Sequence, residues 1–230
     1  MRYVRTIGVA VVAMVGAAQA EDGFTAIHMD NQKMGSAVSA YWRSQAVNGA
    51  GSLHDAARSG DVDLVNELVA DGADINERDA TGETPLLAAA LAGQTAIVEL
   101  LLSAEADPTV RNDRGMLPLH AAAFAGDLSA VTVLLENDLS TTLNDHENKF
   151  GVTPLIVAAE EDHGEVVTLL TAKGADLEIA KRHGYTALTR ASYKANEDII
   201  TLLMKSGAQC QEIDPAWLEN CSKRKAAMGL

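Results

Sequence analysis

The sequence contains few of the residue patterns on which catalysis and metal binding depend. It has only two cysteines, and it shows no Gly-x-Ser-x-Gly, no His-Glu-x-x-His and no glycine loop of the phosphate-binding kind. Its six histidines have no mutual spacing that is typical of a metal site. We therefore predict a protein that is not an enzyme and that uses neither a metal nor a cofactor.

Basic residues and aromatic residues are also scarce. The 230-residue chain has 18 basic and 32 acidic residues, a net charge of −14, and an aromatic content of 4%. A broad excess of negative charge argues against nucleic acid and against anionic membrane surfaces as partners. The low aromatic content is consistent with a core that is filled by alanine and leucine.

The first twenty residues have the pattern of a secretory signal. Two arginines precede an apolar run of 11 residues, Ile7 to Ala17, and Ala18-Gln19-Ala20 is a small-x-small cleavage site. The run is too short to cross a bilayer, because a membrane span needs about 20 helical residues. We predict a signal peptide at 1–20 and a periplasmic protein that begins at Glu21 and has no membrane attachment after cleavage. A retained anchor is the alternative.

One nine-residue pattern recurs through the chain. Its clearest copy, G-E-T-P-L-L-A-A-A, begins at Gly82, and the glycines that begin successive copies are 33, 33, 36 and 33 residues apart. The three extra residues of the third interval fall within Asn137 to Asn148. A fixed period of this length indicates a repeat architecture. The five copies occupy 49–57, 82–90, 115–123, 151–159 and 184–192.

Each copy predicts a pair of helices. Thr84 suits the N-cap of the first helix and Pro85 its first position. Pairs of alanines follow, which let neighbouring helices approach closely. The second helix has apolar residues at helical spacing, as in Ile97, Val98 and Leu101. One such unit cannot bury its apolar surface alone, so the units must stack.

The period and the Thr-Pro-Leu-His-x-Ala pattern resemble the ankyrin repeat. The resemblance implies an all-α solenoid of five stacked helix-turn-helix repeats with β-hairpin loops and terminal capping helices. Glu105 and Asp162 depart from the family's pattern, which usually has glycine there. An N-terminal capping segment, or alternatively a binding arm, is expected at 21–48, and a C-terminal cap and tail at 217–230. The five repeats are assigned to 49–81, 82–114, 115–150, 151–183 and 184–216.

The resemblance also implies where a partner binds, because ankyrin proteins use a groove between hairpin tips and first helices. Four of the eight aromatic residues after the signal sequence fall on such positions, and aromatic anchors are typical of protein interfaces. The alternative is that these rings stiffen the stack. Basic residues also concentrate there, a distribution that favours an acidic partner. The positions assigned to partner binding are Arg58, Leu91, Arg114, Met116, Phe124, Lys149, Phe150, Val152, Glu160, Arg182, His183, Tyr185, Tyr193 and Lys194.

The expected function is therefore that of a non-catalytic module that binds another exported protein and is a monomer when free. Exported bacterial proteins that look like this one support a periplasmic haem catalase in oxidative-stress defence, or act as an inhibitor or immunity protein against an envelope-acting enzyme. The sequence leaves both settings open. A structural spacer and an enzyme with a site near His146 are further alternatives, the latter without motif support. Three other histidines (His54, His120 and His163) occupy positions that the family uses for hydrogen bonds between and within repeats.

A short helix is predicted to begin at Asp214-Pro215, with Cys210 before it and Cys221 after it. Paired cysteines persist in an oxidising periplasm, so we predict a disulfide that holds the C-terminal cap on the last repeat. A buried Cys210 with a free Cys221 is the alternative. Residues 223–225, which are all basic, are expected to form a solvated tail.

Overall fold

The computed structural model describes residues 52–137, 139–180, 184–212 and 215–230. The predicted signal peptide (1–20) and the segment at 21–48 lie outside these residues. In the described part of the chain the regular structure is helical, with no β-strand. None of the helices in this part is long and apolar enough to cross a membrane.

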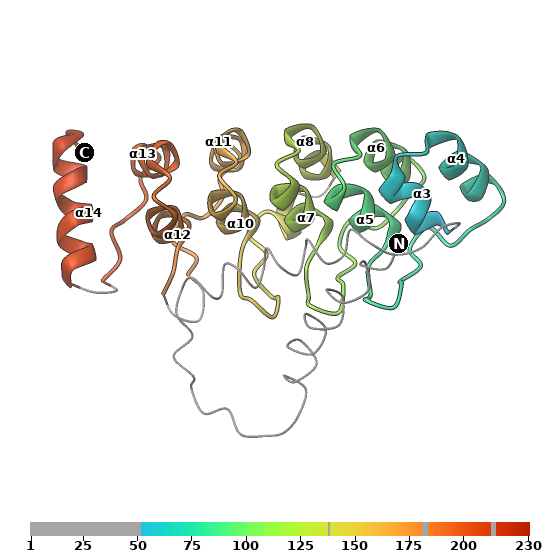
Figure 1. The fold of residues 1–230 in the computed structure, drawn as a ribbon, viewed down its shortest axis with the longest axis horizontal. Coiled ribbons are helices and arrows are strands. Elements are labelled where there is room, and N and C mark those ends of the chain that lie inside the picture. The colour runs from blue at the N-terminus through green and yellow to red at the C-terminus, as the bar shows by residue number, and fades with distance from the viewer. Residues whose placement is uncertain (1–51, 138, 181–183, 213–214) are drawn as a thin grey trace, which may run out of the picture. The chain divides into compact units, whose positions relative to one another are not determined.

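The helices form two rows, because each repeat contributes one helix to each row (Figure 1). The inner row consists of α3 (Leu53–Ser59), α5 (Pro85–Leu91), α7 (Pro118–Ala125), α10 (Pro154–Glu160) and α12 (Ala187–Lys194). The outer row consists of α4 (Val62–Ala70), α6 (Thr95–Ser103), α8 (Leu128–Asn137), α11 (Gly164–Ala172) and α13 (Glu197–Lys205). Each helix packs against the next one in its row and against its partner in the same repeat. The predicted all-α stack of helix-turn-helix repeats is therefore confirmed.

The inner helices begin as the Thr-Pro pattern predicts. Thr84 Oγ1 accepts a hydrogen bond from the Leu87 amide at 3.2 Å, and Pro85 is the first residue of α5. In the third repeat Leu117 replaces the threonine, and the Leu117 amide donates instead to Nδ1 of His120 at 3.3 Å. The His120 amide, which has no hydroxyl to bond to here, donates to the Leu117 carbonyl at 3.0 Å, so the helix start is kept by the backbone and the histidine ring together.

The core lies between the two rows and along the contacts of the inner helices. Small residues make the inner contacts: the alanine pairs of the first four repeats have at most 1% of their surface exposed. One leucine per repeat lies beneath them with at most 3% exposed, namely Leu53, Leu86, Leu119, Leu155 and Leu188. Burial of one such leucine contributes about 2 kcal/mol. The repeating core explains why stacking, rather than any single repeat, stabilises the fold.

The loops between repeats are tight turns rather than paired strands. The Asp79 amide donates to the Glu83 carbonyl at 2.9 Å and the Asn112 amide to the Met116 carbonyl at 3.1 Å. Adjacent turns are joined by backbone hydrogen bonds, as from Lys149 to Arg114 at 2.8 Å. These isolated bonds do not form a ladder in the described residues, so the predicted β-hairpin loops take the form of hydrogen-bonded turns. We call residues 78–83, 111–116 and 147–152 the turn tips.

The extra residues of the third repeat form a short helix. Helix α9 (Leu139–Thr142) lies within the segment to which the insertion was assigned. It is followed by Leu143, which is 6% exposed, while Thr142 in its last turn is 2% exposed. The insertion therefore adds buried packing at the end of α8 as well as loop length.

Among the residues that the structure describes, three other than glycine adopt left-handed backbone angles: Glu105 with φ 67°, Asp162 with φ 66° and Ala195 with φ 58°. The first two are the positions at which the repeat pattern replaces glycine. Ala195 follows α12 at the position that Gly60, Gly93 and Gly126 hold in the first three repeats. A Cβ atom in this conformation costs roughly 1–2 kcal/mol, because it crowds the following carbonyl oxygen.

The substitution Ala195→Gly is expected to raise the free energy of unfolding by about 1 kcal/mol, since it removes this strain. Denaturant unfolding of the two proteins measures the difference. Ala92→Gly is a matched control, because Ala92 ends α5 with φ −82°. It should have no effect or should destabilise, and an equal gain from both substitutions would show that backbone strain is not the cause.

Candidate functional site

One residue in the last turn of each inner helix occupies an equivalent position, and we call these five residues the inner-helix ends. They are Arg58, Leu91, Phe124, Glu160 and Tyr193. Tyr193 is 44% exposed, and the first three are half-buried. The inner-helix ends therefore include accessible apolar and aromatic side chains next to the turn tips.

In the fifth repeat, an aromatic pair connects an inner-helix end with the residue after the repeat's first glycine. The rings of Tyr185 and Tyr193 lie edge to face, with centroids 5.8 Å apart. Tyr185 follows Gly184, which begins the fifth copy of the sequence pattern, whereas Tyr193 is in the last turn of α12. Edge-to-face pairs of this kind are favourable, so the contact favours the observed orientation of the exposed tyrosine.

A second aromatic residue lies at the tip between repeats three and four. The guanidinium carbon of Arg114 lies 5.8 Å from the centre of the Phe150 ring, a cation–π geometry. Phe150 is half-buried, and its neighbour Lys149 is exposed. Lys194, beside Tyr193, is exposed as well. Aromatic and cationic side chains therefore occur together in repeats three to five.

Three of the residues assigned to partner binding are buried, and these assignments are wrong. Met116 and Val152 are 0% exposed, and Glu160 is 4% exposed. Met116 and Val152 follow the tip glycine, and their amides donate to the Oδ1 atoms of Asn112 and Asn148 at 3.0 and 3.1 Å. This closed turn directs the side chain after the glycine toward the core, so the residue at that position is part of the core.

Glu160 is buried for a different reason. Its Oε2 lies 3.5 Å from Nη2 of Arg190, which α12 of the next repeat supplies and which is 3% exposed. A buried carboxylate needs such a cation, because desolvation of an isolated charge is costly. The pair joins repeats four and five and is part of the stack rather than of the accessible surface.

Arginines make the other ion pairs of the inner surface. Arg58 Nη2 lies 3.1 Å from both Asp79 and Glu83, so its guanidinium is held by the next turn. Burial opposes ionisation of Asp79, but hydrogen bonds from Thr81, Glu83 and Arg58 outweigh it and lower the pKa of this carboxyl. Arg58 therefore contributes to the contact between repeats one and two.

A network that the sequence pattern did not indicate links repeats two and three. Arg111 donates to both carboxylate oxygens of Asp145 at 2.7 Å, and Asp145 is 7% exposed. Nε2 of the buried His120 lies 3.2 Å from the Asp145 carbonyl. Burial lowers the pKa of His120. Burial also opposes ionisation of Asp145, but the interactions with Arg111 and His120 outweigh this effect, so the pKa of Asp145 is lowered. In the sequence, only the 33-residue spacing of Arg78 and Arg111 pointed to this network.

The three histidines at family positions make the hydrogen bonds expected of them. His54 Nε2 lies 2.8 Å from the Glu83 carbonyl of the next repeat, and His163 Nε2 lies 2.9 Å from the Phe124 carbonyl of the preceding one. His146 is exposed, with Nδ1 3.0 Å from the Asn144 carbonyl. The described residues include no group of three or more histidines, cysteines or carboxylates that could hold a metal ion.

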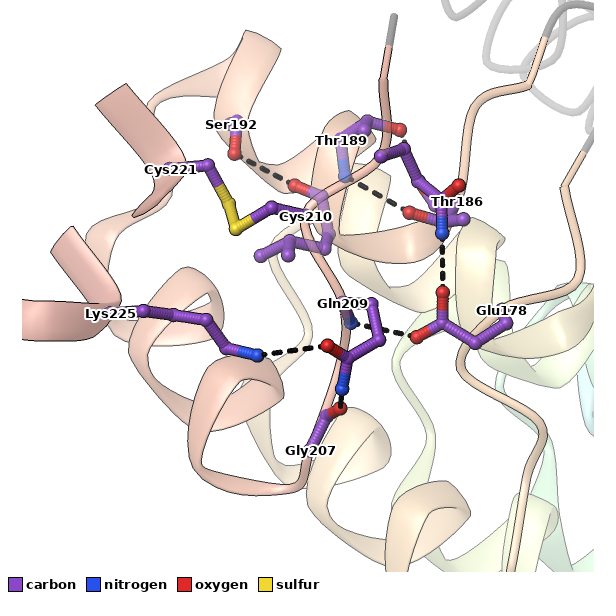
Figure 2. Close-up of a disulfide and its surroundings, with 11 residues drawn as sticks. Glu178, Thr186, Thr189, Ser192, Gly207, Gln209, Cys210, Cys221 and Lys225 are labelled. Atoms are coloured by element: carbon purple, nitrogen blue, oxygen red, sulfur yellow. Dashed lines mark hydrogen bonds between the residues drawn. A yellow bond between two sulfur atoms is a disulfide. The ribbon is translucent and has the colours of Figure 1, made fainter. Parts of the chain in front are cut away.

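The predicted cysteine pair is present at the C-terminal end. Cys210 and Cys221 form a disulfide that ties helix α14 (Pro215–Ala227) to the segment after α13, at the end of the fifth repeat (Figure 2). Cys221 stands 33 residues after Leu188, at the position of the buried leucines, and is 5% exposed. Arg224 adds contacts of 2.6 and 3.2 Å to the two carboxylate oxygens of Glu197 on α13.

Two details of the C-terminal prediction are wrong. Cys221 lies within α14 rather than after it, and Lys223 to Lys225 continue the same helix instead of forming a separate tail. Lys225 Nζ lies 3.4 Å from Oε1 of Gln209, and the backbone amide of Gln209 donates to the Glu178 carboxylate at 2.8 Å (Figure 2). Helix α14 is longer than the short helix predicted at this position.

Arg182 and His183, the remaining assigned positions, lie outside the described residues. Among the described ones, those with accessible side chains are Leu91, Arg114, Phe124, Lys149, Phe150, Tyr185, Tyr193 and Lys194, together with the ion-paired Arg58.

Comparison with known proteins agrees with the repeat pattern. A family model for ankyrin repeats, which contains three copies, matches residues 53–145 and 140–214, more than half of the chain. The mouse (Mus musculus) protein named Ankyrin repeat and SAM domain-containing protein 6 is 42% identical to this chain over 62 residues. That match covers 26% of this chain and only 7% of the mouse protein's length. The chain belongs to the ankyrin-repeat family.

Proposed function

We propose that this protein is a non-catalytic module that binds another exported protein through the inner-helix ends and turn tips of repeats two to five. The observation that carries the proposal is Tyr193, an aromatic ring with 44% of its surface exposed and with its orientation favoured by the contact with Tyr185. A rigid tyrosine supplies contact area at a small cost in conformational entropy. Family membership supports the proposal, because ankyrin repeats are typical of protein interaction modules.

The accessible residues also have the composition of a binding surface. Phe124 and Leu91 are half-buried at the centre of the inner-helix ends, and Phe150 is half-buried at a turn tip. Protein interfaces are enriched in aromatic residues and arginine, and their strongest anchors are tyrosine, tryptophan and arginine. Arg114 over Phe150 meets this description. A purely structural spacer would not need an exposed tyrosine at this position.

We place the protein in a periplasm after removal of residues 1–20. Two observations support this location: the signal-like sequence before Glu21, and a disulfide, which is typical of oxidising compartments. Within the periplasm, we propose that the partner is a haem catalase and that the module supports oxidative-stress defence. The alternative is an envelope-acting enzyme that the module inhibits. Mass spectrometry of the protein captured from periplasmic extract distinguishes these two partners.

Alanine substitution of Phe124, Phe150 or Tyr193 is expected to weaken binding of the captured partner. Truncation of an aromatic anchor costs about 2 kcal/mol or more, which corresponds to roughly a 30-fold rise in Kd. Surface plasmon resonance with the wild-type protein and each variant measures the change. Circular dichroism should show that the helices are retained, because none of these rings is fully buried.

The matched control is Glu99→Lys on α6, which changes an exposed residue of the outer row. It should leave Kd unchanged. Normal binding by all three alanine variants together with loss of binding by Glu99→Lys would place the interface on the outer row and refute the proposed surface.

A further inference from the structure

Charge is distributed unequally between the two rows of helices. The five outer helices contain seven carboxylates and one lysine, Lys205. All seven carboxylates are exposed: Asp63, Glu67, Glu99, Glu136, Glu165, Glu197 and Asp198. The outer row therefore carries most of its charge as negative charge in contact with water, and it would attract a basic partner rather than an acidic one.

The carboxylates of the inner surface are in a different situation. Every carboxylate of the inner helices and turn tips lies within 4 Å of an arginine nitrogen, at distances of 2.8 to 3.8 Å. These residues are Asp55, Asp79, Glu83, Asp113, Glu147 and Glu160. Four arginines, Arg58, Arg78, Arg111 and Arg190, make these contacts, so each of the six carboxylates has a cation close to it.

Two lysines of the inner surface take no part in these ion pairs. Lys149 and Lys194 are exposed, and neither makes an ion pair with another residue that the structure describes. Each is the sequence neighbour of an aromatic residue, Phe150 or Tyr193. Arg114 adds a third cation over the Phe150 ring. Positive charge therefore accompanies the aromatic rings in repeats three to five, on a chain whose net charge is −14.

We propose that the segment recognised by this surface is acidic, with carboxylates for Lys149 and Lys194 beside apolar side chains for Phe150 and Tyr193. This inference rests on the proposed function and specifies the chemistry of the partner. The exposed carboxylates of the outer row repel an acidic segment, whereas the exposed lysines of the inner surface attract it. A basic segment would be drawn to the outer row instead. Complementary charge of this kind favours correct encounter and excludes wrong partners.

The test is a selection of random 16-residue peptides displayed on phage against the full chain without its signal peptide. The enriched peptides are expected to have a net negative charge and at least one aromatic or large aliphatic residue. Synthetic versions should bind the Lys149→Glu/Lys194→Glu variant at least about tenfold more weakly, because attraction becomes repulsion. Binding to wild type should weaken as salt is added. The matched control is Lys173→Glu/Lys205→Glu, two exposed lysines outside the inner surface, which should bind normally.

The possible outcomes separate this inference from the proposed function. Neutral or basic peptides that still depend on Tyr193 would refute the acidic segment and leave the binding surface intact. Peptides whose binding is unaffected by either Tyr193→Ala or the double lysine reversal would refute both. Absence of any enriched peptide would refute recognition of a linear acidic segment. Self-association of wild type that Lys149→Glu/Lys194→Glu abolishes would show that a second copy occupies the surface, which also overturns the inference.

Discussion

Asp145→Asn is expected to lower the free energy of unfolding by about 2–3 kcal/mol. The substitution keeps the size of the side chain but removes the charge that Arg111 contacts with two hydrogen bonds of 2.7 Å. Loss of one partner from a fully buried ion pair costs about 3–5 kcal/mol. The expected value is smaller, because the Arg111 side chain is 34% exposed and can regain contact with water. Urea unfolding followed by circular dichroism measures the change.

The ion pair made by the equivalent arginine one repeat earlier provides a control. Arg78 lies 33 residues before Arg111 and contacts Asp113 at 2.8 Å, but the two side chains are 48% and 59% exposed. Exposed ion pairs contribute about 1 kcal/mol or less. Asp113→Asn should therefore cost far less than Asp145→Asn. Similar losses from the two substitutions would show that burial of the Asp145 carboxylate does not set the strength of the pair.

Stability should also depend on pH through this network. The pKa of Asp145 is lowered below 3.8, so its ion pair stabilises the fold above that pH and the contribution is lost as pH falls through the folded value. The pKa of His120 is lowered below 6.5, so the unfolded chain binds the proton more readily and stability also decreases as pH falls below 6.5. The Asp145→Asn variant should lack the acidic part of this dependence.

Removal of the disulfide by Cys210→Ser/Cys221→Ser is expected to destabilise the C-terminal end by about 2–3 kcal/mol. A cross-link between residues 11 apart restricts the unfolded chain by about this amount. The loss should be local, because α14 is terminal and repeat arrays unfold from their ends. Hydrogen exchange of wild type and variant should show faster exchange in α14 and α13 and little change in α5 to α8.

The same pair connects the fold with the proposed location. Intact-mass measurement of protein recovered from the periplasm should show loss of residues 1–20 and a mass two hydrogens below that of the reduced chain. Arg224→Ala is the control for the cap, because it removes a largely exposed ion pair with Glu197 and keeps the disulfide. A retained Met1 would contradict export with cleavage, and two titratable thiols in the exported protein would contradict the disulfide.

Local sequence determined most of the fold, because each helix start depends on neighbouring residues. At the beginning of α5, Pro85 is the first residue and the capping hydrogen bond of Thr84 is made within the first turn, to the Leu87 amide. The paired cysteines were predictable because the chain has only two. Ala195 shows the limit of local patterns: the stack imposes a left-handed conformation that alanine does not favour.

The candidate site was harder to predict, since exposure depends on contacts between repeats. Met116 and Tyr185 follow equivalent tip glycines, yet Met116 is 0% exposed and Tyr185 is half-buried in the last repeat. Glu160 has the polarity of a surface residue, but Arg190 from the next repeat lies 3.5 Å away and makes burial tolerable. Spacing alone identifies such positions without showing which way each side chain points.

The most direct test of the proposed surface is photo-crosslinking in intact cells with p-benzoylphenylalanine placed at position 193. The side chain of Tyr193 is exposed at the end of α12, and Glu99 on α6 provides an exposed position in the outer row. The proposed function predicts a covalent adduct with a single exported protein from position 193 and none from position 99. An adduct from position 99 but not from position 193 would contradict it.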